Sequence, residues 1–240
     1  MTRPHYELTL NGPAKNALGT SMLHFIRDGI REAAGRPILV SGAGGALSSG
    51  LNLKEIASLD ASGMERFLKL LEDALVALYT YPAPTVARVD GHAVAGGCVL
   101  ALCCDHAVGV NDPRARIGLN EVALGLRFPP RILGLVRDRI PPQRHTEVLL
   151  GAGLYDPAGA LRVGLLDELC PDAEAASARA LEKLAALSAH PAQAYADTKR
   201  DLRAGNVAIT PEQEARFYRA LVPVWTSEEV RARILAVLKR

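Results

Sequence analysis

The stretch "DGHAVAGGCVLALCCD", residues 90–105, joins two adjacent glycines to an apolar run. Gly96 and Gly97 stand where a turn would lead into a helix over residues 98–104. The first backbone N–H groups of such a helix have no intrahelical acceptor, so a developing oxyanion could lie against them. Glycine also permits close helix packing, and this segment taken alone favours that structural interpretation.

Upstream of this stretch, patterns of strand and helix alternate. Residues 5–12 alternate as a half-buried strand, residues 22–34 have a helical period, and residues 36–44 and 85–91 are typical of short strands. Ser62 and Glu65 predict a capping box. The helix that follows has one apolar face, formed by Met64, Phe67, Leu68, Leu71, Leu75 and Leu78. This order favours a layered α/β domain.

Downstream, after about residue 170, only helical patterns remain. They cover residues 172–190 and 191–205, and two more helices open at Thr210-Pro211 and Ser227-Glu228. We therefore expect a core over residues 1–170 and a helical region over residues 171–240. The last two helices either fold back on the core or pack on another subunit. Their apolar residues are Phe217, Tyr218, Leu221, Val224, Trp225, Ile234 and Leu238.

Composition narrows the class of protein. The 240 residues are 49% hydrophobic and carry a net charge of +2 with mixed signs, which argues against a nucleic-acid partner. The first residues resemble neither a secretory signal nor a transit peptide, and no apolar run reaches the length of about 18 residues that a membrane span needs. We expect a soluble, cytoplasmic protein with no membrane partner.

The cysteines and histidines give no motif of their own. Cys98, Cys103 and Cys104 crowd one apolar segment and no C-x-x-C pair exists, so we expect neither a metal site nor a disulfide. We expect His92 and His106 to be hydrogen-bonded to neighbours, because no nucleophile motif accompanies them.

A second glycine-rich stretch, "SGAGGALSSGLNLKE", covers residues 41–55. Its register does not fit a dinucleotide-binding fingerprint, because Leu47 stands where the third glycine of G-x-G-x-x-G is needed. A plain surface turn remains an open interpretation of this segment.

The stretch "IGLNEVALGL", residues 117–126, contains a single carboxylate, Glu121, among apolar or neutral residues. The structural interpretation is an ion pair with Arg116 or Arg127. The functional interpretation is an acid or base in apolar surroundings, which raise the pKa of a carboxyl group. The segment alone does not decide between the two.

Taken together, "SSGLNLKE", "GHAVAGGCVLA", the following "CD" and "IGLNEVALG" resemble, in order and spacing, the crotonase superfamily of enoyl-CoA hydratases and isomerases. "LNGPAKNALG" and "GLYDPAGALRVGLLDELC" extend the resemblance over most of the chain. It implies an α/β spiral of ββα units with C-terminal helices that build a homotrimer or hexamer. It also implies an acyl-CoA thioester as substrate, with no cofactor and no metal.

The resemblance also implies roles for particular residues. The backbone amides of Leu51 and Gly96 would stabilise the thioester oxyanion. The substrate-binding set would be Leu47, Ser48, Ser49, Gly50, Asn52, Leu53 and Gly97, with Asn120 orienting the substrate. Lys15 and Lys54 would meet the CoA phosphates, or are solvated surface charges. Acyl chain length would depend on residues 57–67 and, as a further option, on a C-terminal helix of a neighbouring subunit.

Family hydratases use two glutamates, and Val99 stands at the position of the first. Glu121 matches the second. One base can move a proton between two carbons of an enolate, so the resemblance favours the Δ3-Δ2-enoyl-CoA isomerase branch. The alternatives are hydration, thioester hydrolysis or decarboxylation, and, in a different class, a non-catalytic CoA-binding subunit.

Overall fold

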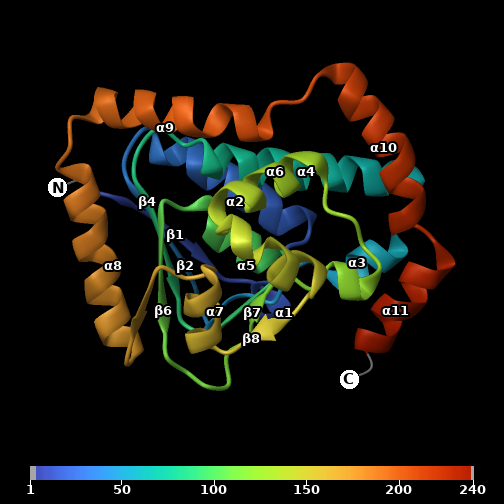
Figure 1. The fold of residues 1–240 in the computed structure, drawn as a ribbon, viewed down its shortest axis with the longest axis horizontal. Coiled ribbons are helices and arrows are strands. Elements are labelled where there is room, and N and C mark those ends of the chain that lie inside the picture. Colours follow the sequence, from blue (N-terminus) through green and yellow to red (C-terminus); the bar gives the residue numbers. More distant parts are fainter. Residues whose placement is uncertain (1–3, 239–240) are drawn as a thin grey trace.

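The structure is a computed structural model that describes residues 4–238. Its larger sheet has five strands, all parallel, in the order β1-β2-β4-β6-β9 (Figure 1). The strands are β1 (Tyr6–Leu10), β2 (Ile38–Gly42), β4 (Thr85–Val89), β6 (His106–Val110) and β9 (Glu168–Cys170). Every residue of β2 is buried, as expected for a parallel sheet that is covered on both faces.

The smaller sheet has the order β3-β5-β7-β8. Its strands are β3 (Ala46–Ser48), β5 (His92–Val94), β7 (Ile117–Gly118) and β8 (Leu154–Tyr155), and only β8 runs antiparallel to its neighbour. The chain passes from the larger sheet to the smaller one three times, from β2 to β3, β4 to β5 and β6 to β7. These repeated passages produce the stacked ββα turns of a crotonase-type spiral, so the α/β prediction is confirmed.

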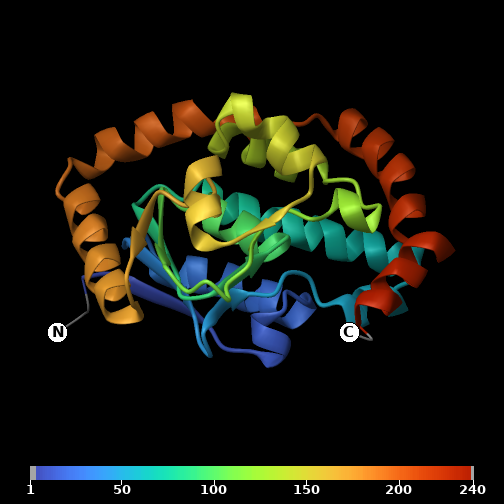
Figure 2. The same cartoon turned by 60° about the horizontal axis from the view of Figure 1, so that its bottom comes forward.

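Helices α1 to α7 accompany these strands. They are α1 (Pro13–Asn16), α2 (Thr20–Ala33), α3 (Leu53–Ser58), α4 (Ala61–Tyr79), α5 (Gly96–Cys103), α6 (Pro130–Arg139) and α7 (Pro157–Val163), with short helical turns at Val122–Leu124 (η1), Pro142–Arg144 and Thr146–Leu150. All eight residues of α5 are buried, which places this helix inside the core (Figure 2).

One helix start differs from the prediction. The apolar face of α4 is buried as expected, but its N-cap is Asp60, whose side chain accepts from the Gly63 N–H, and not Ser62. Ser62 lies inside the first turn, where its hydroxyl accepts from the Arg66 guanidinium. The predicted capping box at Ser62 and Glu65 is therefore wrong, because an aspartate two residues earlier offers an equally good cap.

Four helices follow the last strand: α8 (Ala173–Ser188), α9 (Ala192–Val207), α10 (Pro211–Trp225) and α11 (Glu228–Leu238). They run around the outside of the core from one end to the other (Figures 1 and 2). Tyr218, Leu221, Trp225 and Ile234 are buried against this same chain. Of the two interpretations offered by the sequence, folding back on the core is thus the one observed for these residues. No helix within residues 4–238 is both long and apolar enough to cross a membrane.

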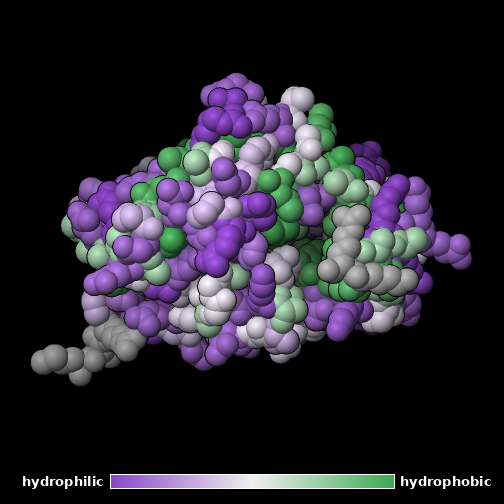
Figure 3. All heavy atoms as spheres, turned by 90° about the horizontal axis from the view of Figure 1, so that it is seen from below, coloured by the Kyte–Doolittle hydropathy of each residue, from purple (hydrophilic) through white to green (hydrophobic). Residues whose placement is uncertain are grey.

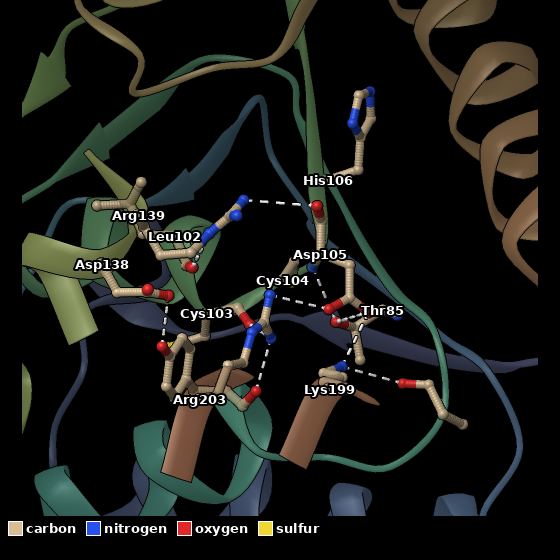
Figure 4. Close-up of polar contacts among 12 residues, drawn as sticks. Thr85, Leu102, Cys103, Cys104, Asp105, His106, Asp138, Arg139, Lys199 and Arg203 are labelled. Atoms are coloured by element: carbon tan, nitrogen blue, oxygen red, sulfur yellow. Dashed lines mark hydrogen bonds and ion pairs between the residues drawn. The ribbon is translucent and has the colours of Figure 1, made fainter. Parts of the chain in front are cut away.

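A buried ion cluster fixes α9 to the core (Figure 4). Asp105, which follows α5, accepts from Lys199 Nζ at 2.8 Å and pairs with Arg203 Nη2 at 3.0 Å. The Thr85 backbone N–H donates to the same carboxylate at 2.8 Å. The side chains of Asp105, Lys199 and Arg203 are each less than a tenth exposed. These contacts therefore fix the direction in which the chain continues toward α10 and α11.

Candidate active site

The loop that contains Leu51 follows β3 and bends at Gly50, whose φ of +96° favours glycine. Leu18 N–H donates to the Gly50 carbonyl at 2.8 Å, and Asn52 N–H donates to the Leu18 carbonyl at 3.0 Å. In such a parallel bridge the amide of the intervening residue points away from the partner strand. The Leu51 N–H accordingly donates to no acceptor within residues 4–238.

Gly96 is the first residue of α5, and its N–H is likewise without an acceptor in the described part of the chain. A Cβ on Gly96 would lie 3.0 Å from Leu51 Cδ2, so the two segments touch. A Cβ on Gly97 would lie 2.5 Å from the Ser48 carbonyl oxygen. The close packing at Gly96 and Gly97 therefore brings the unpaired N–H groups of Leu51 and Gly96 together.

A hydrogen-bond network beneath this loop was not predicted from the sequence. The buried Asn16 amide donates to the carbonyls of Ala43 at 3.0 Å and Ala46 at 2.9 Å. The Ser48 hydroxyl donates to the Asn16 carbonyl at 2.8 Å and accepts from Gly50 N–H at 3.1 Å. The feature of the sequence that could have indicated this network is Asn16 in "PAKNAL". Asparagine tolerates the left-handed conformation that this residue adopts at φ 60°.

The side chains of the loop are occupied by the protein itself. Ser49 Oγ donates to the Ala14 carbonyl at 2.7 Å, Asn52 Oδ1 caps α3, and Leu47 is buried in the core. The Glu55 carboxylate, also missed from the sequence, accepts from the Thr20 N–H at the start of α2. A ligand at this loop would therefore meet backbone groups.

The turn at Gly44 and Gly45 does not have the geometry of a dinucleotide-binding site. Gly44 and Gly45 connect β2 to β3 with φ angles of +73° and +72°, and a strand follows where the fingerprint requires a helix. Gly44 and Gly45 are exposed, so the surface-turn interpretation holds for residues 43–45 but not for the whole of residues 41–55, which include the buried strand β3.

Two basic side chains, those of Lys15 and Arg116, lie near His92. Lys15 and Lys54 are both exposed. The pKa of His92 is lowered by burial and then by the charges of Lys15 and Arg116, which places these cations near its ring. His92 Nδ1 accepts from the Arg116 backbone N–H at 3.2 Å, and His106 bonds to Glu168 at 2.9 Å, so both histidines have the neighbours that were expected.

Glu121 immediately precedes η1 and is 7% exposed. Its Oε2 is buried and has no hydrogen-bond partner among the described residues. Arg116 donates to the carbonyls of Pro113 and Ala115, and Arg127 stacks on the Phe217 ring. The ion pair offered as the structural interpretation is therefore absent from the described structure. Burial raises the pKa of Glu121 to about 7.

Strand pairing brings Glu121 to the same place as the amides. β7 pairs with β5, and Ala95 N–H donates to the Gly118 carbonyl at 2.8 Å, one residue before Gly96. The Cys98 thiol of α5 has its pKa raised by burial and then by the charge of Glu121, so the carboxylate faces this helix. Two unpartnered amides and one buried carboxylate thus surround the N-terminus of α5, a combination typical of enolate chemistry.

Asn120, beside the carboxylate, also has a buried oxygen, Oδ1, that accepts no hydrogen bond from a described residue. A buried acceptor without a donor costs about 1–3 kcal/mol, so two on consecutive residues make this a candidate functional position. Val99, on α5, is 1% exposed. A valine there supplies no second carboxylate.

The same chain's α11 covers this region. It contacts both α3 and η1, and Arg231 Nη2 donates to the Leu59 carbonyl at 2.7 Å. Seen from below, the surface has a hollow in which hydrophobic atoms are visible (Figure 3). Residues 57–67, expected to shape an acyl pocket, thus meet a C-terminal helix of their own chain. No cluster of three or more potential metal ligands occurs within residues 4–238, and the four cysteines are free.

Curated proteins of similar sequence include isomerases and hydratases. Enoyl-CoA delta isomerase 1, mitochondrial, of Mus musculus is 31% identical over 77% of this chain and 65% of its own length. A putative enoyl-CoA hydratase of Thermus thermophilus is 32% identical over 68% of this chain and 64% of its own length. The chain spans somewhat less than two thirds of each of these two relatives.

Among solved structures, human mitochondrial delta3-delta2-enoyl-CoA isomerase superposes with a TM-score of 0.90, covering 98% of this chain and 92% of that one at 24% identity. An enoyl-CoA hydratase/isomerase family protein from Pseudomonas syringae gives a TM-score of 0.82 at 27% identity, covering 90% of this chain and 93% of that one. The sequence profile of the enoyl-CoA hydratase/isomerase family matches residues 6–231. With this fold, this site and this match, the chain belongs to the enoyl-CoA hydratase/isomerase family of enzymes, within the crotonase superfamily.

Proposed function

We propose that the protein is an enoyl-CoA isomerase that moves the double bond of a 3-enoyl-CoA into conjugation with the thioester. Glu121 acts as the single acid and base. The Leu51 and Gly96 amides hold the thioester oxygen. The observation that carries the proposal is one buried carboxylate with a pKa of about 7 beside two free amides, where Val99 takes the place of a second glutamate.

The reaction follows from these groups. Glu121 removes a proton from C2, and the electrons of that C–H bond form a dienolate whose negative oxygen accepts from the Leu51 and Gly96 N–H groups. Losing one such donor typically costs about 3 kcal/mol of transition-state stabilisation. The protonated Glu121 then returns the proton to C4, so the C3=C4 bond becomes C2=C3 and no atom is gained or lost.

The raised pKa of Glu121 suits both halves of this transfer. A carboxylate with an ordinary pKa near 4.5 would be a weak base for a carbon acid, whereas one near 7 accepts and releases a proton at similar cost at neutral pH. Burial supplies the shift, and no neighbouring charge is needed.

The remaining roles complete the proposal. The CoA moiety lies against backbone groups of residues 47–54, its phosphates meet Lys15 and Lys54, and Asn120 orients the acyl group. The reaction needs no cofactor and no metal. We also propose a homotrimer or hexamer located in the cytoplasm.

The test is the absorbance of the conjugated enoyl thioester after the protein is mixed with 3-hexenoyl-CoA, and separately with crotonyl-CoA. A rise with the first substrate and little change with the second supports the isomerase. Loss of absorbance with crotonyl-CoA alone means hydration in spite of Val99. Release of free thiol means thioester hydrolysis, loss of CO2 from a malonyl-type thioester means decarboxylation, and binding without any turnover means a non-catalytic subunit.

A further inference from the structure

The segment that carries Glu121 has little regular structure of its own. Between β7, which ends at Gly118, and α6, which begins at Pro130, it contains only the short turn η1. Its internal hydrogen bonds are local, such as Leu126 N–H to the Glu121 carbonyl at 2.9 Å. The position of the carboxylate therefore depends on what packs against the segment.

Helix α10 makes a direct contact with it. Trp225, the last residue of α10, is 2% exposed, and its indole Nε1–H donates to the Arg127 carbonyl at 3.1 Å. This carbonyl lies in the irregular part of the segment, where no strand or helix partner is available. The ring of Phe217, from the same helix, lies against the Arg127 guanidinium, with 5.1 Å between the centre of the ring and Cζ of the arginine.

A second contact holds the far end of the segment. Glu72 of α4 is fully buried and accepts from the Arg131 backbone N–H at 2.8 Å, in the first turn of α6. Its other oxygen accepts from the Tyr218 hydroxyl of α10 at 2.5 Å. One helix thus fixes the segment twice, directly through Trp225 and through the Glu72 carboxylate.

We propose that Trp225 is a positioning residue for Glu121: its indole N–H holds the Arg127 carbonyl and thereby keeps the carboxylate buried beside the Leu51 and Gly96 amides. This inference rests on the proposed role of Glu121 as the base. It gives the C-terminal helices of this chain a part in its own catalysis, since a buried carboxylate is placed by a residue about a hundred positions away.

The other charged and titratable groups near the segment do not substitute for the hydrogen bond from Trp225. Within residues 4–238, the titratable group that faces Glu121 is the Cys98 thiol of α5. Arg233 of α11, which lies against Gly125, is paired with Glu229. Arg127 is engaged by Phe217, and Glu72 lies under α6, bonded as described. A change in the pH dependence of Trp225→Phe would therefore report the surroundings of Glu121.

The test compares wild type with Trp225→Phe, which keeps an aromatic ring and removes the N–H. Tyr218→Phe is the second variant, and Tyr81→Phe is the control, because Tyr81 also has a buried, hydrogen-bonded hydroxyl but contacts Gly35 and Arg36 instead. We expect Trp225→Phe to lower kcat on 3-hexenoyl-CoA by roughly tenfold with KM changed less than about threefold. The apparent pKa of kcat/KM should move below 7, toward the ordinary value, as water reaches Glu121.

An unchanged kcat and an unchanged pH profile in Trp225→Phe would overturn the proposal, even if its melting temperature fell. Should that variant fail to fold, the same two criteria apply to Tyr218→Phe. Hydrogen–deuterium exchange of the peptide over residues 119–128 supplies a readout that needs no turnover. Faster exchange in Trp225→Phe but not in Tyr81→Phe is expected, so positioning can be confirmed even if the wild-type protein proves not to be an isomerase.

Discussion

Gly96 and Leu51 meet side by side: a Cβ on the glycine would lie 3.0 Å from the leucine Cδ2. The two residues belong to segments far apart in the chain, yet their unpaired amides need this approach in order to bind one oxygen atom. The neighbouring Gly97 sets how near α5 comes to the loop, because there is no room for a Cβ between it and the Ser48 backbone.

Replacing Gly97 with alanine should separate these two segments. The new Cβ would stand 2.5 Å from the Ser48 carbonyl oxygen, which is backbone and has little freedom to move. We expect kcat/KM to fall by roughly 100-fold and the free energy of unfolding by about 1–3 kcal/mol. Gly205→Ala in α9 is the control, because nothing lies within 4 Å of its Cβ position. Equal activity of the two variants would contradict this account of the amide pair.

The burial of Glu121 has a consequence for stability. Its pKa is about 7 in the folded protein, above the unfolded value of 4.5, so the native state binds more protons between these values. Stability therefore falls as pH rises from 4.5 through 7, by about 3 kcal/mol in total from this group. Glu121→Gln should remove this loss. Denaturant unfolding should show that the free energy of unfolding of the variant, relative to that of wild type, is higher at pH 8 than at pH 5. The same difference at both pH values would count against this account.

The same pKa sets the pH dependence of the reaction. Glu121 must be ionised to accept the C2 proton, so kcat/KM on 3-hexenoyl-CoA should rise about tenfold per pH unit below 7 and level off above it. The measurement is the initial rate at low substrate between pH 5 and 9. A midpoint near 4.5 would mean that the base is a solvated carboxylate and not Glu121 as placed here.

The Asp105 cluster should matter for folding more than for chemistry. Asp105→Asn leaves Lys199 and Arg203 buried without a counter-charge, which costs about 3–5 kcal/mol. Asp201→Asn, which removes an exposed partner of Arg200, should cost less than about 1 kcal/mol. Urea unfolding measures both. A near-zero effect at Asp105 would show that α9 does not depend on this cluster.

Local patterns in the sequence predicted the strands β1, β2 and β4 and the helices α2, α4, α5 and α8 to α11, since these depend on neighbouring residues. The apolar face of α4 is buried, and Thr210 forms a capping box with Gln213 at the start of α10. The predicted cap at Ser62 failed because two cap candidates stood two residues apart, and short-range pattern does not rank them.

The site required more than pattern. The motifs placed Leu51, Gly96 and Glu121 through a family resemblance, and the structure adds why each is available: a loop bend at Gly50, a helix start, and burial beside α5. Contacts such as Trp225 to Arg127 join residues that nothing in the linear sequence connects. Such tertiary hydrogen bonds depend on the packed fold, so they became visible only in three dimensions.

The most direct test of the central claim is the turnover of 3-hexenoyl-CoA by wild type and by Glu121→Gln, followed by conjugated-enoyl absorbance. Glutamine is nearly the same size, and it cannot take up the C2 proton. The account predicts a clear rise in absorbance with wild type and a loss of at least about 1,000-fold in kcat with the variant. A Glu121→Gln variant that keeps near-full turnover would contradict it.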